Sequence, residues 1–214
     1  MSKIAWDAVG AHLYETGVDH GVLYQVDNNG VYKDGVAWNG LTSVSESPSG
    51  AEETALYADD QKYLSLYSAE DFGATIEAYT YPDEWSECDG SKEIAPGVMA
   101  GQQARKGFGL AYRTVLGNDE QGESYGYKLH IVYGAMASPS EKSYESVNDS
   151  PEAVTFSWEF TTTPIQVSGL DKPTAQLTID STKITNTAMT AIEAALFGSV
   201  STEPTLLTPA ERSE

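Results

Sequence analysis

The chain has 214 residues, with 32 acidic side chains against 12 basic ones and a formal net charge of −20. This excess of acid excludes proteins that hold nucleic acid or anionic membrane surfaces through clustered Lys and Arg side chains. The hydrophobic fraction of 40% is ordinary for a folded protein, so the acidity is not that of a disordered chain. The length suits one large β-domain, or one domain with an appendage.

The single cysteine, Cys88, cannot form a disulfide within the chain, so a secreted disulfide scaffold is not expected. Residues Met1 to Trp6 lack the apolar core of a signal peptide. No run of the sequence approaches the roughly 18 apolar residues that a membrane span needs. We therefore expect a soluble protein that is made in a reducing cytoplasm and has no membrane partner.

Alternation of apolar and polar residues predicts a mainly β chain. Asn28-Asn29-Gly30 predicts a turn between two strands, because Asn-Gly tolerates positive φ. Gly117 to Ser124 predicts the connection of an antiparallel hairpin. In chain order, the predicted strands contain Gly21 to Asp27, Val31 to Tyr32, Leu64 and Leu66, Ile76 to Thr80, Phe108 to Thr114, Tyr127 to Tyr133, Val154 to Thr161, and Leu177 and Ile179.

One segment, Ser45 to Gln61, lies between strand signals and is too long for a hairpin turn. Loops of more than about 12 residues in compact domains are usually functional or disordered. Two interpretations stay open: a solvated acidic loop, or an interaction arm whose apolar residues dock on a neighbouring copy. The residues of this segment that we place at a subunit interface are Glu52, Glu53, Leu56, Tyr57, Asp59 and Asp60.

Helix signals are few. Pro82 to Cys88 predicts one or two turns, because Pro stands at a first helical position and acidic residues follow it. Thr187 to Phe197 predicts a longer helix with Asn186 as its N-cap and Gly198 at its end. From Ser199 to Glu214 no periodicity remains, so we expect a tail that is ordered only if a partner orders it.

Catalytic chemistry finds little support. His12, His20 and His130 lie in no recognisable triad context, and His130 alternates with apolar residues as a sheet-face histidine would. Acidic neighbours on both sides of Cys88 disfavour a reactive thiolate. One cysteine and scattered histidines cannot form a zinc cluster. We expect no enzymatic activity, no cofactor and no metal.

The adjacent basic pair Arg105-Lys106 is too small a patch for nucleic acid, but it is sufficient for a salt bridge to an acidic loop of a neighbouring copy. The aromatic residues Trp38, Tyr79, Trp85 and Trp158 predict core packing, with a sugar-stacking face as the alternative. Close pairs of carboxylates do not indicate a glycosidase here, because a chain with 32 acidic residues has such pairs in any fold.

Several long stretches of the chain resemble the major tail tube protein of long-tailed, non-contractile bacteriophages (siphovirus type) that infect Gram-positive bacteria. The resemblance spans roughly Ala37 to Lys183. The stretches that carry it are Phe72 to Ser91 (FGATIEAYTYPDEWSECDGS), Gly101 to Gln103 (GQQ), Gly109 to Asn118 (GLAYRTVLGN), Gly126 to Tyr133 (GYKLHIVY), Asn148 to Thr163 (NDSPEAVTFSWEFTTT) and Lys172 to Thr182 (KPTAQLTIDST).

The resemblance implies an antiparallel β-sandwich or barrel of the phage tail tube type, with a flanking short α-helix and a long interaction loop. The expected organisation is a tail tube domain over residues 1–198, with an N-terminal arm of about 1–20, the loop 45–61 and a C-terminal helix of about 186–197. Residues 199–214 are the expected C-terminal tail.

The function that the resemblance implies is structural. Hexameric rings stack into a helical tube of the virion, which is assembled in the host cytoplasm around the tape-measure protein. The distal tail protein and the tail terminator are the expected partners at its two ends. During genome ejection DNA passes through the lumen without specific binding, and we expect Asp and Glu side chains of the inner-barrel strands to face it.

Two other functions remain as alternatives. The first is a carbohydrate-binding β-sandwich module of a virion tip, which would need aromatic side chains exposed on one sheet face. The second is an acidic glycosidase.

Overall fold

The computed structural model describes residues 4, 6–144, 146, 153–167, 170 and 172–208. Within these residues the protein is mainly β with antiparallel strand pairs and a flanking α-helix, so the predicted fold class is confirmed at this level. The described strands are β1 (Tyr14–Gln25), β2 (Val36–Trp38), β3 (Leu41–Glu46), β4 (Ser49–Gly50), β5 (Glu53–Ala58), β6 (Gln61–Tyr67), β7 (Glu70–Asp71), β8 (Gly73–Ala78), β9 (Lys92–Ala95), β10 (Val98–Ala100), β11 (Phe108–Asn118), β12 (Gly122–Ala137), β13 (Phe156–Thr162) and β14 (Gln176–Asp180). The helices are α1 (Trp85–Cys88) and α2 (Asn186–Phe197).

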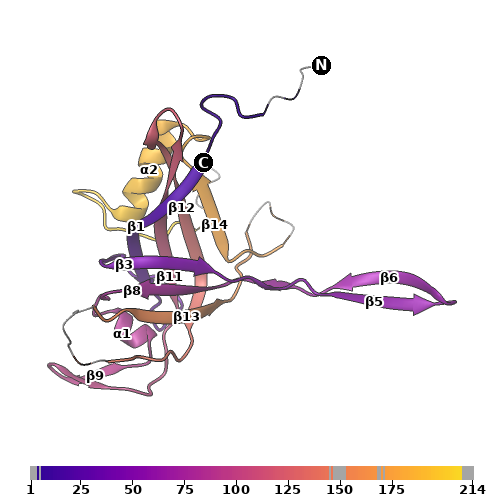
Figure 1. The fold of residues 1–214 in the computed structure, drawn as a ribbon. Coiled ribbons are helices and arrows are strands. Elements are labelled where there is room, and N and C mark those ends of the chain that lie inside the picture. The colour runs from indigo at the N-terminus through magenta and orange to yellow at the C-terminus, as the bar shows by residue number, and fades with distance from the viewer. Residues whose placement is uncertain are drawn as a thin grey trace.

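Eight of the described strands form one sheet in the order β2-β1-β11-β12-β13-β8-β3, with β14 paired to β12 beside β13. Figure 1 shows that the sheet folds over itself: β13, β8 and β3 run across β1, β11, β12 and β14. The two parts face each other as two layers, which is the arrangement of an orthogonally packed β-sandwich.

The sheet bends within β12. One part of this strand pairs with β14 from Lys128 to Val132, and its last residues pair with β13 from Ala135 to Ala137. Gly134 lies between these two parts with φ +59, and a Cβ at this position would lie 2.3 Å from the carbonyl oxygen of Thr163. Only glycine tolerates both the backbone conformation and the close approach, so Gly134 allows one strand to belong to two layers.

The space between the layers is filled by aromatic side chains. The rings of Trp38 and Trp85 lie 4.7 Å apart, and Trp158 lies 5.4 Å from Trp85. All three tryptophans are buried, which confirms the prediction of core packing for them, whereas Tyr79 is 55% exposed. The short helix α1, at the position predicted from Pro82, places Trp85 in this cluster.

Helix α2 covers the other face of β1, β11 and β12. Its buried residues Met189 and Leu196 join a second core cluster with Leu129 and Ile131 of β12. The helix ends at Gly198, as predicted, but Thr185 caps it rather than Asn186, since the Thr185 side chain accepts the backbone N–H of Ala188. The middle of β12 is therefore buried on both faces, between α2 and the second layer.

Two predictions about the chain ends are wrong. The expected N-terminal arm of about 1–20 is shorter, because β1, which pairs with β11, already begins at Tyr14. The expected tail is partly ordered without a partner: Leu206 is buried, and the Tyr133 hydroxyl donates to the carbonyl oxygen of Leu207 at 2.6 Å. Residues 209–214 lie outside the described part of the chain.

The predicted hairpin between β11 and β12 is confirmed. Strand β11 ends at Asn118 and β12 begins at Gly122, with Asn118 paired to Gly122. The Asn118 side chain accepts the backbone N–H of Gln121 at 2.6 Å and so holds the turn. Turn residue Asp119 accepts hydrogen bonds from the His12 side chain and from the backbone N–H of Gly10, which lower its pKa to about 2. Residues before β1 are therefore attached to this turn.

Candidate functional site: the projecting arm and the polar cluster at its root

The segment predicted as a long loop over 45–61 is instead part of a projecting β-ribbon. Residues 49–71, here called the arm, run out from the body in β4 and β5 and return in β6 and β7, as Figure 1 shows on the right. Backbone hydrogen bonds from Ser47 to Gly73 and from Ala51 to Ala69 continue the β3–β8 pair of the body into the arm. The prediction failed because the partners of residues 49–58 lie beyond residue 60, in the returning strand.

The turn at the end of the arm is made by Asp59 and Asp60. Both residues have positive φ, of 51° and 58°. This is the conformation of a type I′ turn, which usually carries Asn-Gly, and Asp is among the few other residues that tolerate it. The turn therefore places two exposed carboxylates at the point of the arm farthest along the ribbon from the body.

One face of the arm is apolar. Leu56 pairs with Leu64 and Thr54 with Leu66, so their side chains lie on the same face of the two strands. We call Leu56, Leu64 and Leu66 the apolar stripe; they are 41%, 39% and 53% exposed. Among the described strands, β5 pairs only with β6, so no further strand joins the arm on either side.

The opposite face of the arm is polar and aromatic. The Glu53 carboxylate accepts hydrogen bonds from the Lys62 ammonium and the Ser65 hydroxyl, which lower the pKa of Glu53. Tyr57 and Tyr67 lie on this face and are mostly exposed. Of the predicted interface residues, Leu56 thus lies on the apolar face, while Glu53 and Tyr57 lie on the polar one.

The predicted basic interface residues lie elsewhere. Lys106 donates to the Glu87 carboxylate at 2.7 Å, and Arg105 donates to the backbone carbonyl of Asp89 at 3.1 Å. The hydrogen bond from Lys106 lowers the pKa of Glu87, and this effect is larger than that of burial, which raises the pKa. Both contacts are with residues at the end of α1, so the structure does not bring Arg105 and Lys106 together with the arm of the same chain.

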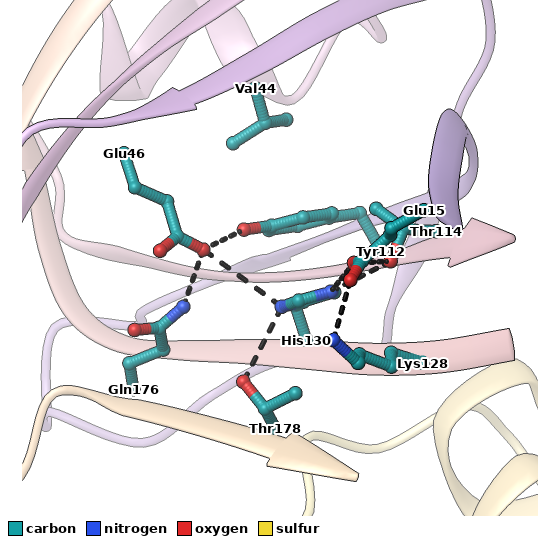
Figure 2. A pocket seen from close by; sticks show the side chains of 9 residues that line it. All are labelled: Glu15, Val44, Glu46, Tyr112, Thr114, Lys128, His130, Gln176 and Thr178. Carbon is teal, nitrogen blue, oxygen red and sulfur yellow. Dashed lines mark hydrogen bonds and ion pairs between the residues drawn. The ribbon is translucent and has the colours of Figure 1, made fainter. Parts of the chain in front are cut away.

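A polar cluster lies at the root of the arm, where β3 crosses the other layer (Figure 2). Its centre is His130 on β12, whose ring stacks on Tyr112 of β11 at 4.7 Å. Glu46, the last residue of β3, accepts a hydrogen bond from the Tyr112 hydroxyl at 2.8 Å and another from Gln176 of β14 at 2.5 Å. The root of the arm is thereby bonded to the opposite layer.

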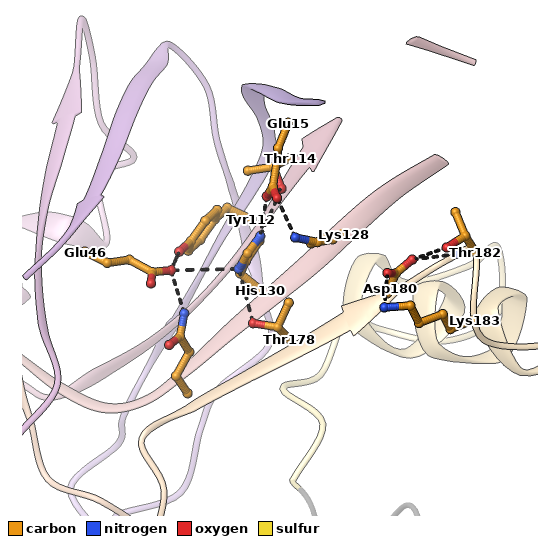
Figure 3. Close-up of polar contacts among 11 residues, drawn as sticks. Glu15, Glu46, Tyr112, Thr114, Lys128, His130, Thr178, Asp180, Thr182 and Lys183 are labelled. Carbon is orange, nitrogen blue, oxygen red and sulfur yellow. Dashed lines mark hydrogen bonds and ion pairs between the residues drawn. The ribbon is translucent and has the colours of Figure 1, made fainter. Parts of the chain in front are cut away.

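Glu15 of β1 contacts the cluster from the other side (Figure 3). Its carboxylate accepts hydrogen bonds from Lys128 and Thr114, and one oxygen lies 3.6 Å from Nε2 of His130. Burial opposes ionisation of Glu15, but these bonds outweigh it and lower its pKa. For His130 burial is the largest effect and lowers the pKa, against the attraction of Glu46 and Glu15. Burial, followed by the bond to Glu46, raises the pKa of Tyr112.

The cluster superficially resembles a hydroxyl–imidazole–carboxylate triad, since Thr114 Oγ1 lies 2.9 Å from Nε2 of His130. However, the Thr114 hydroxyl donates to Glu15. The Glu46 oxygen lies 3.9 Å from Nδ1, which is too far for a hydrogen bond that would orient the ring. The geometry is therefore that of a polar contact between layers. Sequence reasoning placed His130 on a sheet face but missed the cluster, because its members come from five strands.

Other chemistry-bearing groups form no site in the described residues. Cys88 is buried, and burial raises the pKa of its thiol to about 12. Among the described residues no group of three or more His, Cys, Asp or Glu side chains could hold a metal ion. No described helix is long and apolar enough to cross a membrane.

Comparison with known proteins does not place the chain in a family: no protein-family model matches it, and no curated protein matches it.

Proposed function

We propose that this chain is a tail tube protein of a long-tailed, non-contractile bacteriophage, in which hexameric rings stack into a tube around the tape-measure protein. The proposal extends the sequence resemblance, and the observation that carries it is the arm. Its apolar stripe of Leu56, Leu64 and Leu66 is exposed in the single chain, at the end of a ribbon that leaves the body (Figure 1).

An isolated two-stranded ribbon is at best marginally stable in water. Covering a leucine side chain completely contributes about 1.5–3 kcal/mol relative to full exposure. A second copy that covers the stripe would therefore stabilise the arm as well as join two subunits. In the proposed tube the stripe meets a different surface of the neighbour, so the contact is heterologous, and heterologous contacts produce rings or open filaments.

The layer formed by β1, β11, β12 and β14 supports ring formation. In the described chain β14 pairs only with β12, and β2 pairs with β1 only from Gly21 to Leu23, so residues 14–20 leave one edge of β1 open. The four strands alternate in direction, which makes the two open edges antiparallel to each other. Consider copies that are related by rotation about an axis that runs along these strands. The β14 edge of one copy would then lie antiparallel to the β1 edge of the next copy. Pairing between the two would leave neither edge open.

Beyond the part that β3 and its neighbours cover, the same layer has an uncovered polar face opposite α2. Glu15, Thr114, Lys128 and Thr178 lie on this face, and Asp180 is paired with Lys128 in register, so its side chain lies there too (Figure 3). We propose that this face lines the lumen of the tube. With a net charge of −20 on each copy, DNA would be repelled from all sides of the lumen and would pass without specific binding.

The test is the assembly state of the purified full-length chain. Negative-stain electron microscopy and sedimentation velocity should show long hollow polymers, formed alone or with the tape-measure protein and the distal tail protein. In this proposal the tube belongs to the virion and assembles in the host cytoplasm. A chain that stays monomeric in the presence of those partners would refute the proposal.

One observation favours the alternative of a carbohydrate-binding module. Tyr57, Tyr63 and Tyr67 of the arm are 72%, 72% and 68% exposed, and exposed aromatic rings can stack on sugars. Binding of the purified chain to a glycan array, lost in a Tyr57→Ser and Tyr67→Ser variant, would favour this function. Absence of glycan binding together with tube formation would exclude it.

A further inference from the structure

A pocket of about 520 Å³ lies between the end of α1, the start of β9 and the segment before β11. Three of its lining residues are basic, namely Lys92, Arg105 and Lys106, and one, Glu87, is acidic. The whole chain has only 12 basic residues against 32 acidic ones, so this excess of positive charge is unusual for its surface. We call this the basic pocket.

Two of the three cations are not neutralised in the described chain. Glu87 pairs with Lys106, but neither Lys92 nor Arg105 forms an ion pair with a described residue. Arg105 lies against Gly90, with its Cζ 3.4 Å from where a Cβ would be, and among the described residues it donates only to the backbone carbonyl of Asp89. Ser91 and Gln103 add side chains that can donate to an anion. The pocket therefore fits carboxylates.

The end of the arm supplies carboxylates of this kind. Asp59 and Asp60 are exposed, and no described residue forms a hydrogen bond or ion pair with their side chains. The type I′ turn fixes the backbone of both residues, so the two carboxylates are presented together. With ten residues on its outgoing side, from 49 to 58, the arm reaches about 30 Å at roughly 3.3 Å per residue.

Within one chain the two features cannot meet. Figure 1 shows β5 and β6 extending to one side of the body, while α1 and β9 lie on the other. From this placement and the opposite charges we infer that the Asp59-Asp60 turn of one copy inserts into the basic pocket of a neighbouring copy. The inference rests on the proposed function, and it names the surface on which the arm ends.

Such a contact explains how a chain with this much negative charge can associate in one orientation. Charge complementarity across an interface fixes register and suppresses wrong partners more than it adds affinity. The apolar stripe would supply most of the affinity, and the turn in the pocket would select the position of the arm on the neighbour.

The first experiment is a charge exchange in the full-length chain. Variant A carries Asp59→Lys and Asp60→Lys, variant B carries Lys92→Glu and Arg105→Glu, and variant C carries all four changes. We expect A and B each to raise the concentration needed for assembly at least about tenfold, because like charges then face each other. Variant C should assemble at close to the wild-type concentration, since the charges are complementary again.

The controls separate this contact from net charge and from turn shape. The control for variant A carries Glu141→Lys and Glu203→Lys and has the same net charge as variant A. The control for variant B carries Lys172→Glu and Lys183→Glu and has the same net charge as variant B. Both controls should assemble at the wild-type concentration. Asp59→Asn with Asp60→Asn keeps residues that tolerate positive φ and should show an intermediate defect. Circular dichroism spectra should be unchanged in every variant.

A second experiment uses the wild-type assembly. A carbodiimide joins a carboxylate to an amine without a spacer, so mass spectrometry should identify an amide link between Asp59 or Asp60 and Lys92 or Lys106. Wild-type tubes without this link, or a variant C that assembles no better than A and B, would overturn the inference and leave the proposed function intact. Wild-type protein that does not assemble with its partners would overturn both.

Discussion

Glu46, the last residue of β3, accepts a hydrogen bond from the Tyr112 hydroxyl of β11 at 2.8 Å. The two residues belong to different layers of the sandwich, and Glu46 stands directly before the root of the arm. Because Gln176 of β14 donates to the same carboxylate oxygen, this single side chain connects three strands. The strand that leads into the arm is therefore held to the opposite layer through one carboxylate.

Replacing Glu46 by Ala should destabilise the protein by about 1–3 kcal/mol, because the buried Tyr112 hydroxyl loses its acceptor. Glu46→Gln keeps an acceptor oxygen and should cost less. Urea unfolding measures the loss of stability, and hydrogen exchange should show faster exchange in residues 49–71 for Glu46→Ala. Equal exchange in both variants would contradict the role of Glu46 in holding the arm.

Removal of the arm should separate folding from assembly. Replacing residues 51–69 by two glycines takes away both strands of the ribbon, so the monomer should keep its melting temperature while tubes no longer form. Deleting only 51–60 would leave β6 without its partner β5, so that shorter deletion is expected to aggregate. Normal tubes from the chain without residues 51–69, seen by electron microscopy, would exclude the arm from the subunit interface.

The two faces of the arm can be tested with neighbouring residues. Leu66 lies in the apolar stripe and Tyr67 on the opposite face, and both are exposed. Changing either to Ser should alter monomer stability by no more than about 0.5 kcal/mol, as is usual at exposed positions. Assembly, followed by light scattering, should be weakened by Leu66→Ser and unchanged by Tyr67→Ser. The reverse result would assign the interface to the aromatic face.

Stability should fall with acidification in a window set by His130. Burial lowers its pKa in the folded state below the ordinary 6.5, so the unfolded chain takes up a proton first. The stability from neutral His130 is present above pH 6.5 and is lost as the pH falls below it. Glu15, whose pKa is lowered from 4.5, contributes its own loss only at more acidic pH. Between pH 7 and about 5.5 the melting temperature should therefore fall less for His130→Gln than for the wild type.

The segment after α2 should contribute to the stability of the monomer. Leu206 is 5% exposed and packs in the core cluster that α2 covers. Leu206→Ala should therefore cost about 2–5 kcal/mol, as for other buried leucines. Leu207→Ala, at a partly buried neighbouring position, should cost less. A melting temperature unchanged by Leu206→Ala would show that this segment is not required for the fold.

Local sequence patterns were sufficient for much of the fold. The alternation from Phe108 to Tyr133 predicted β11 and β12 and their hairpin, and the spacing of Met189 and Leu196 predicted α2. These elements are determined by short-range periodicity, which does not depend on what packs against them. The arm was missed because its strands pair with each other across a turn of Asp59 and Asp60, which carries neither Gly nor Asn.

The sequence by itself determined the strand content, the strong negative charge and the resemblance from which the function is proposed. The tertiary structure decided which residues share a surface. It brought His130, Glu15 and Glu46 together from three strands, and it separated β5 and β6 of the arm from α1 and β9, beside which the basic pocket lies. The physical reason is that contacts between distant segments depend on how the sheet bends at Gly134, a long-range property that the pattern of neighbouring residues does not encode.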